Sequence, residues 1–133
     1  AAASFSEISA QADELGIELL GNVDDMYGLI AESQICVLPS RREGVPLFVV
    51  ESMAHAKPVI VFDVPGCNEV VRHQKTGFIV PLNDSRELAE RIRELVENTR
   101  LRSSLGRAGL VVAKTEYNLE SIKFAFSDLI QTA

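Results

Sequence analysis

Two glutamates, Glu43 and Glu51, are the residues whose type and spacing could do chemistry in this sequence. They flank a loop that contains Gly44 and enters a predicted helix at about Pro46. Proline suits a first helical turn, because its missing N–H would have no partner there. The first amides of a helix lack partners within it and favour an anion such as a diphosphate. A carboxylate repels a neighbouring phosphate, so its presence there indicates a different function. Its two acceptor oxygens suit the vicinal hydroxyls of a sugar.

The amides expected to hold that anion are those of Val45, Leu47 and Phe48, which lie near the predicted helix start. The loop follows the apolar run Ile35–Leu38, which reads as a strand covered on both faces. Ligands of open α/β sheets bind beyond the carboxyl ends of the strands. The loop is therefore in the right place for a site.

Other segments must form the scaffold of this loop. Val59–Phe62 and Phe78–Val80 are predicted as buried strands, and Ile17–Leu20 as a short strand that ends at Gly21. Apolar spacing and capping signals predict the helices Ser4–Leu15, Asp24–Ala31, one from Pro46, Gly66–Arg72, one after Asp84, Arg100–Ala113 and one from Asn118. Strands separated by helices predict an α/β fold, a Rossmann-like parallel sheet with helices on both faces.

Composition excludes several functional classes. The 133 residues are 47% hydrophobic and 24% charged, as expected for one globular domain. A net charge of −6 disfavours nucleic acid as a partner. Cys36 and Cys67 lie outside any Cys/His cluster, so neither a metal nor a disulfide is expected. No run approaches the roughly 20 apolar residues of a spanning helix, and the start lacks a signal-peptide pattern. A cytoplasmic location is expected.

The surroundings of the two glutamates resemble a known family. Glu43 and Glu51, with seven residues between them, lie within Pro-Ser-x-x-Glu-Gly-x-Pro and precede Met53-Ala54. This pattern resembles the paired-glutamate motif of retaining glycosyltransferases of GT-B fold, glycosyltransferase family 4. The similarity covers nearly the whole chain in the family's usual order, through Lys57–Val61, Pro65–Val71, Thr76–Pro81 and the helix after Asp84.

The resemblance implies a role for each matching position. Glu51 would bind the ribose hydroxyls, Glu43 would contact the donor sugar as the catalytic residue, and the amides after Gly44 would hold the phosphates. The implied donor-binding residues are Gly21, Asn22, Val23, Ser40, Arg42, Glu43, Gly44, Val45, Pro46, Leu47 and Glu51. The donor would be a nucleotide-diphosphate sugar, bound without metal or other cofactor. The segments Glu43–Pro46 and Gly66–Glu69 look most like those of enzymes that use UDP-sugars. The acceptor would be a glycan or a lipid-linked sugar, which adds the inner face of the membrane as a location for a full-length enzyme.

The chain departs from the family pattern in two respects. The chain corresponds to a C-terminal domain without its first strands and without the acceptor-binding N-terminal domain, so the isolated chain is expected to be inactive. The missing strands predict that Ile17–Leu20 lies beside Ile35–Leu38, or that another chain pairs with the exposed edges in a homodimer. The family usually has glycine where Ala56 stands, which predicts modest strain or a different helix cap.

Simpler interpretations remain open at this stage. The two glutamates could be solvated, and His55, His73 and Cys67 are most simply packing, solvated or tight-turn residues. A non-catalytic α/β nucleotide-binding or regulatory module is the alternative function. A phosphorylatable receiver would need an aspartate at the end of the Ile35–Leu38 strand, where Pro39 and Ser40 stand, and no GxGxxG of a dinucleotide enzyme follows any strand.

Overall fold

The computed structural model describes residues 3–117, so the helix predicted from Asn118 lies outside the described residues. Three parallel strands form one sheet in the order β1-β2-β3: β1 is Cys36–Leu38, β2 is Val59–Phe62 and β3 is Gly77–Val80. Cys36 pairs with Val59, which in turn pairs with Gly77. The predicted α/β fold with a parallel sheet is confirmed.

Six helices surround or extend from this sheet within the described part of the chain. They are α1 Phe5–Leu15, α2 Met26–Glu32, α3 Leu47–Ala54, α4 Cys67–Val70, α5 Ser85–Glu97 and α6 Thr99–Glu116. Their bounds fall within a few residues of the predicted ones. Asp84 and Glu87 have the sequence spacing of a capping box, of which one of the two hydrogen bonds is present. The Asp84 carboxylate accepts the N–H of Glu87, whereas the Glu87 carboxylate accepts a hydrogen bond from Arg91 instead.

The core confirms that both faces of the sheet are covered. All four residues of β2 are buried, and their side chains alternate between the two faces. Residues of α3 and α6 complete this core, among them Val50, Met53 and Leu105, each at most 2% exposed. The carboxyl end of β1, where the candidate loop begins, is therefore supported by a packed interior.

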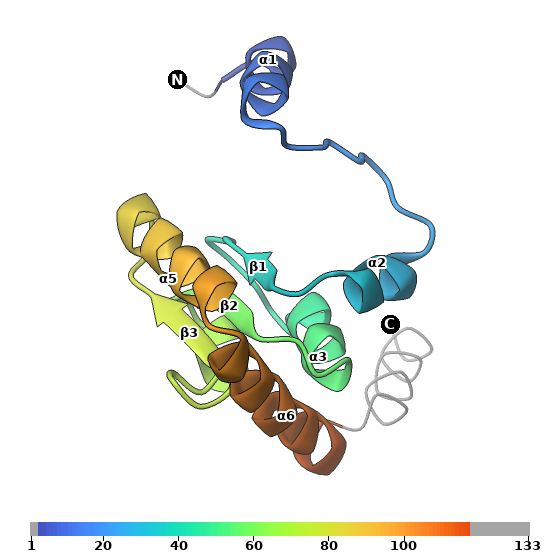
Figure 1. Ribbon diagram of the computed structural model, residues 1–133, viewed down its shortest axis with the longest axis vertical. Coiled ribbons are helices and arrows are strands. Elements are labelled where there is room, and N and C mark those ends of the chain that lie inside the picture. Colours follow the sequence, from blue (N-terminus) through green and yellow to red (C-terminus); the bar gives the residue numbers. More distant parts are fainter. Residues whose placement is uncertain (1–2, 118–133) are drawn as a thin grey trace, which may run out of the picture.

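The prediction of a strand at Ile17–Leu20 is wrong. This segment has no strand pairing, and Ile17, Leu19 and Leu20 are about half exposed. Figure 1 shows α1 and the extended segment after it standing away from the sheet. Within residues 3–117, β1 is paired only with β2, so the expected collapse of Ile17–Leu20 onto Ile35–Leu38 does not occur. A strand exists only where a neighbour accepts its ladder of hydrogen bonds, and none of the described strands lies beside this segment. Pairing with another chain remains a prediction.

The expected strain at Ala56 is present. Ala56 has a φ of 58°, in the left-handed region. Its N–H donates to the carbonyl of Met53 at 2.9 Å, and the N–H of Lys57 donates to that of Ser52 at 3.0 Å. These two bonds form the Schellman motif that ends α3, in which the left-handed position usually holds glycine.

Replacing Ala56 with glycine is expected to stabilise the protein. The left-handed conformation costs a non-glycine residue about 1–2 kcal/mol, and glycine's greater freedom in the unfolded chain offsets about half of that gain. We expect a net gain of about 0.5–1 kcal/mol in the free energy of unfolding, measured by urea denaturation. Ala89→Gly, in the exposed middle of α5, is the matched control and should lose about 1 kcal/mol. A loss of similar size at both positions would contradict this assignment of strain.

Candidate functional site

The candidate site is the loop between β1 and α3. Pro46 is the buried N-cap residue of α3, as its fixed φ suits a helix start, and no side chain caps the helix. The Ser40 hydroxyl donates to Oε1 of the half-buried Glu43 at 2.7 Å, which restrains that carboxylate within the loop. An open cleft of about 390 Å³ is lined by Arg41, Arg42, Glu43, Gly44 and Pro65. The structure thus brings Ser40, Arg42, Glu43 and Gly44 together, as predicted.

The turn at Pro65 and Gly66 packs closely against the backbone of this loop. Gly66 has a φ of 90° and a ψ of −64°, a conformation that residues with side chains rarely adopt. A Cβ at Gly66 would lie 2.6 Å from the carbonyl oxygens of both Glu43 and Gly44. Because this approach needs the absence of a side chain, Gly66 sets how closely the loop lies on the Pro65-Gly66 turn.

Cys67 follows this turn and is fully buried. Burial raises the pKa of the Cys67 thiol, and the neighbouring Glu43 carboxylate raises it further. The thiol therefore stays protonated at neutral pH, and a protonated thiol is a poor nucleophile. Cys67 is a packing residue of the site, as the sequence indicated.

The backbone amides around the start of α3 agree only in part with the predicted anion site. Among the described residues, the amides of Gly44, Val45 and Phe48 have no hydrogen-bond acceptor. The Leu47 amide donates to the carbonyl of Val45 at 2.9 Å, so it has an acceptor where the sequence predicted none. This hydrogen bond belongs to a tight turn at the start of the helix, and residue type alone does not reveal such a bond. Two of the three expected amides therefore remain available.

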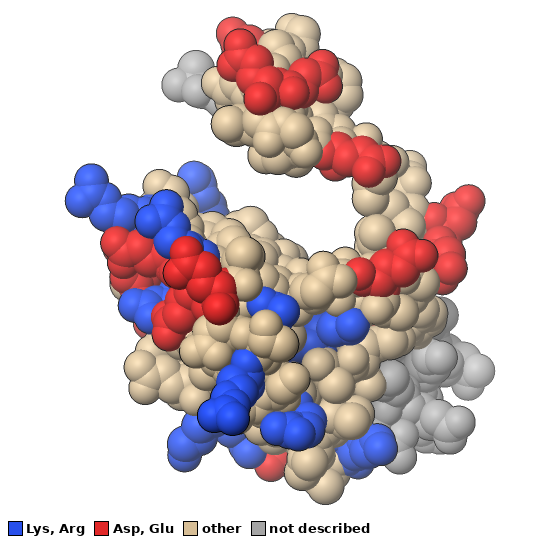
Figure 2. Space-filling model, in the orientation of Figure 1, with Lys and Arg blue, Asp and Glu red and all other residues tan. Residues whose placement is uncertain are grey.

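Positive charge near the cleft comes from two arginines. Arg41 Nε donates to Oδ1 of Asn83 at 3.1 Å. Arg42 has no ion pair or hydrogen bond within residues 3–117, which leaves its guanidinium available to an anion. Residues 3–34 contain no lysine or arginine, and Figure 2 shows their acidic side chains on α1, the segment after it and α2. The side chains of residues 3–34 thus add no positive charge to that of the two arginines.

Glu51 lies in the second turn of α3 and faces α2. The Tyr27 hydroxyl donates to its Oε1 at 3.3 Å, and the Tyr27 ring stacks on His55. His55 Nδ1 lies 2.7 Å from the carbonyl oxygen of Glu51. In the predicted helix Asp24–Ala31, the residues Met26, Leu29 and Ile30 form an apolar stripe at helical spacing. Tyr27 is not part of it, so the sequence did not single out this residue. The only available signal was a tyrosine beside that stripe.

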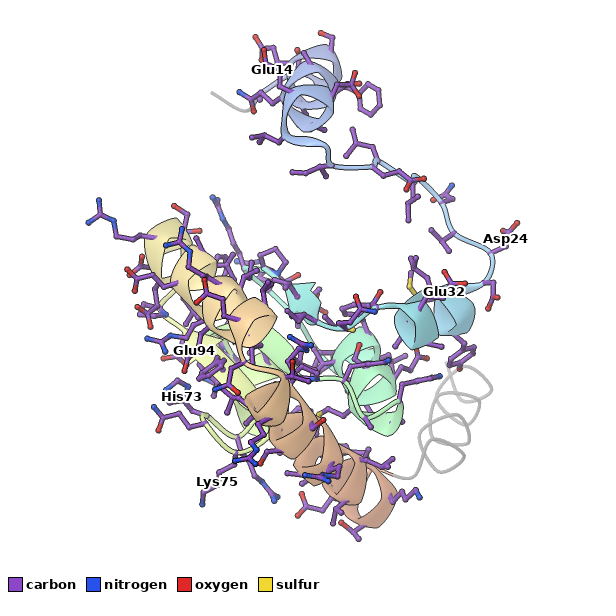
Figure 3. All side chains as sticks on the ribbon, viewed as in Figure 1. Glu14, Asp24, Glu32, His73, Lys75 and Glu94 are labelled. Atoms are coloured by element: carbon purple, nitrogen blue, oxygen red, sulfur yellow. The ribbon has the colours of Figure 1, made fainter. Side chains whose placement is uncertain are left out.

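Three predicted residues are not brought to the loop. Gly21, Asn22 and Val23 lie in the extended segment between α1 and α2, outside the cleft and without a hydrogen bond to residues 40–51. Asp24, labelled in Figure 3, continues this segment up to the start of α2. The role of residues 21–23 near the nucleobase therefore stays a prediction.

His73, also labelled in Figure 3, has a structural role rather than simply facing solvent. Its Nδ1 accepts the N–H of Ile79 at 2.9 Å, and its ring packs edge-on against Phe78. These contacts fasten the turn before β3 to that strand. His73 therefore belongs to the scaffold.

Two further features of the described residues bear on metal and membrane binding. Within residues 3–117, no group of three or more His, Cys, Asp or Glu side chains is placed to hold a metal ion. None of the helices described is both long enough and apolar enough to span a membrane.

Comparison with known proteins agrees with this architecture. A family model described as "Glycosyl transferases group 1" matches residues 2–98. The chain is 38% identical over 100 residues to an uncharacterized glycosyltransferase of Methanocaldococcus jannaschii, covering 74% of this chain and 28% of that protein. It is 33% identical over 91 residues to the N,N'-diacetylbacillosaminyl-diphospho-undecaprenol alpha-1,3-N-acetylgalactosaminyltransferase of Campylobacter jejuni, covering 68% of this chain and 24% of that enzyme.

A solved structure shares the fold. The Anabaena protein HepE, in complex with UDP-glucose, superposes with a TM-score of 0.81 at 24% identity, over 96% of this chain and 36% of that one. The parallel sheet with its helices is that of a C-terminal-like part of a GT-B glycosyltransferase. The chain belongs to the glycosyl transferases group 1 family. It spans about a quarter of the length of these two curated relatives.

Proposed function

We propose that this chain is the donor-binding part of a retaining glycosyltransferase of family 4 that uses a UDP-sugar. The observation that carries the proposal is the loop between β1 and α3. It presents the amides of Gly44, Val45 and Phe48, which have no hydrogen-bond acceptor among residues 3–117, between two half-buried carboxylates, Glu43 and Glu51. Amides at a helix start suit a diphosphate, and carboxylates suit sugar hydroxyls.

Each group has a distinct role in this proposal. The amides and Arg42 bind the diphosphate and stabilise the charge that develops on it as the glycosidic bond breaks. Glu51 accepts hydrogen bonds from the ribose hydroxyls. Glu43, held by Ser40, contacts the donor sugar near the reacting carbon. The negative charge of the leaving group is thus balanced by protein donors, and no metal is required.

The comparisons support the choice of substrates. The Anabaena protein of the same fold binds UDP-glucose, and the Campylobacter relative acts on a sugar linked to diphospho-undecaprenol. We propose a UDP-sugar as the donor and a glycan or lipid-linked sugar as the acceptor. The site of action is the cytoplasm or the inner face of the membrane.

Nucleotide binding tests this function directly. We expect UDP to bind the chain equally well with and without EDTA, and to perturb the NMR signals of Gly44, Val45 and Phe48. Glu51→Gln should weaken UDP about 10-fold, because it removes a charged acceptor from a hydrogen-bonded diol. Glu97→Gln, at the exposed end of α5, is the control and should have no effect.

Two results would count against the proposal. The first is UDP binding that perturbs Ser33 to Ile35, at the opposite end of β1, instead of the loop. The second is full UDP affinity in the Glu51→Gln protein.

A further inference from the structure

Tyr27, Glu51 and His55 form a cluster that joins α2 to α3. The Tyr27 and His55 rings are stacked, with centroids 5.9 Å apart and planes inclined by 28°. The Tyr27 hydroxyl donates to Oε1 of Glu51 at 3.3 Å. His55 is itself tied to α3 through its Nδ1, 2.7 Å from the Glu51 carbonyl oxygen. The tyrosine thus touches both a side chain of the candidate site and the helix that carries it.

The position of Tyr27 is set by local structure in α2. The Asp25 carboxylate caps the helix by accepting the N–H of Gly28 at 2.9 Å. A Cβ at position 28 would lie 2.3 Å from that carboxylate, so any residue other than glycine would require the Asp25 side chain to shift. The side chain of Ile30, in α2 itself, is buried, and Lys57 Nζ donates to the carbonyl of Ala31 at 3.0 Å. The buried Ile30 and the bond from Lys57 attach α2 to the rest of the protein, and Tyr27 thereby lies beside Glu51.

We propose that Tyr27 is a positioning residue that holds the Glu51 carboxylate for recognition of the ribose hydroxyls; this inference rests on the proposed function. A glutamate on a helix surface samples several side-chain rotamers. A donor on Oε1 selects the rotamers that reach it and leaves Oε2 to accept from a ligand. Tyr27 is 43% exposed and Glu51 is partly exposed, so a ligand can approach their contact from solvent.

The test compares two nucleotides that differ only in the groups Glu51 would bind. UDP and 2′,3′-dideoxy-UDP are titrated into the whole chain by calorimetry, with wild type, Tyr27→Phe and Tyr117→Phe. Tyr27→Phe keeps the ring that stacks on His55 and removes only the hydroxyl. Tyr117→Phe makes the same change at the sequence's other tyrosine, which follows α6 and has no hydrogen bond to the site.

We expect the wild type to prefer UDP over the dideoxy nucleotide about 10-fold or more. Tyr27→Phe should weaken UDP about 3–10-fold and leave the affinity for dideoxy-UDP unchanged, because only the ribose contact is lost. Tyr117→Phe should change neither affinity. Thermal melts of all three proteins check that each is folded.

The other outcomes separate the inference from the function on which it rests. If Tyr27→Phe keeps the full preference for UDP, or weakens both nucleotides equally, Tyr27 does not orient Glu51 and the inference fails alone. If the wild type binds no UDP, or shows no preference for it, the proposed donor site fails and the role of Tyr27 fails with it.

Discussion

Replacing Gly66 with alanine is expected to cost the protein about 3 kcal/mol in the free energy of unfolding and at least 10-fold in UDP affinity. The backbone at Gly66 has a φ of 90°, where a side chain adds about 1–3 kcal/mol of strain. The added methyl group would also meet the carbonyl oxygens of Glu43 and Gly44 at 2.6 Å. Neither oxygen can yield without moving the loop, so stability and nucleotide binding should fall together. Urea denaturation and UDP titration measure the two effects.

Gly44→Ala is the matched control for this substitution. Gly44 lies in the same loop and its φ is outside the left-handed region. A Cβ added at Gly44 would have no atom within 4 Å other than those of its chain neighbours. We expect a change of less than about 0.5 kcal/mol in stability. Unchanged stability and UDP affinity in the Gly66→Ala protein would show that the loop does not depend on this close approach.

Replacing Gly106 with alanine is expected to lower stability by about 3 kcal/mol, or the melting temperature by roughly 10 °C. Gly106 lies where α6 crosses the end of α3, and a Cβ there would be 2.1 Å from the carbonyl oxygen of Ala56. The contact is with backbone in the left-handed turn after α3, so rotating a side chain cannot relieve it. The two helices must move apart, which opens the core around Met53 and Leu105.

Gly109→Ala, three residues further along α6, provides the comparison. Its Cβ would lie 3.4 Å from the Met53 side chain, close to an ordinary contact. Alanine favours a helix interior over glycine by up to about 1 kcal/mol, so we expect a neutral or stabilising effect. Thermal denaturation of both variants decides the matter. Equal melting temperatures for Gly106→Ala and the wild type would contradict the close crossing of α3 and α6.

Much of the scaffold could be predicted from the sequence because its signals are local. The apolar run Ile35–Leu38 and the run Val59–Phe62 contain the strands β1 and β2, since residues buried on both faces of a sheet leave no polar alternation. The glycine usual at position 56 predicted strain at Ala56, and the left-handed φ of 58° is that strain. The grouping of Ser40, Arg42, Glu43 and Gly44 followed from their being neighbours in one loop at a strand end.

Other features depend on partners distant in the sequence. Ile17–Leu20 has the composition of a strand, but a strand also requires a hydrogen-bonded neighbour, and in the described structure none lies beside it. The bond of the Leu47 amide to Val45 and the approach of Gly66 to the loop depend on backbone angles that residue type does not specify. The contact of Tyr27 with Glu51 joins residues 24 positions apart.

The sequence by itself determined the class of fold, the order of the helices and of strands β1 to β3, and the loop that carries Glu43 to the start of α3. Burial patterns and turn residues carry that information, because each depends on a few adjacent side chains. Only the tertiary structure decided which amides stay available, which arginine faces the cleft without a partner among the described residues and which side chain holds Glu51. Those outcomes depend on the packing of α2, α3 and the Gly66 turn against one another, and that packing places groups from separate elements at hydrogen-bond distance.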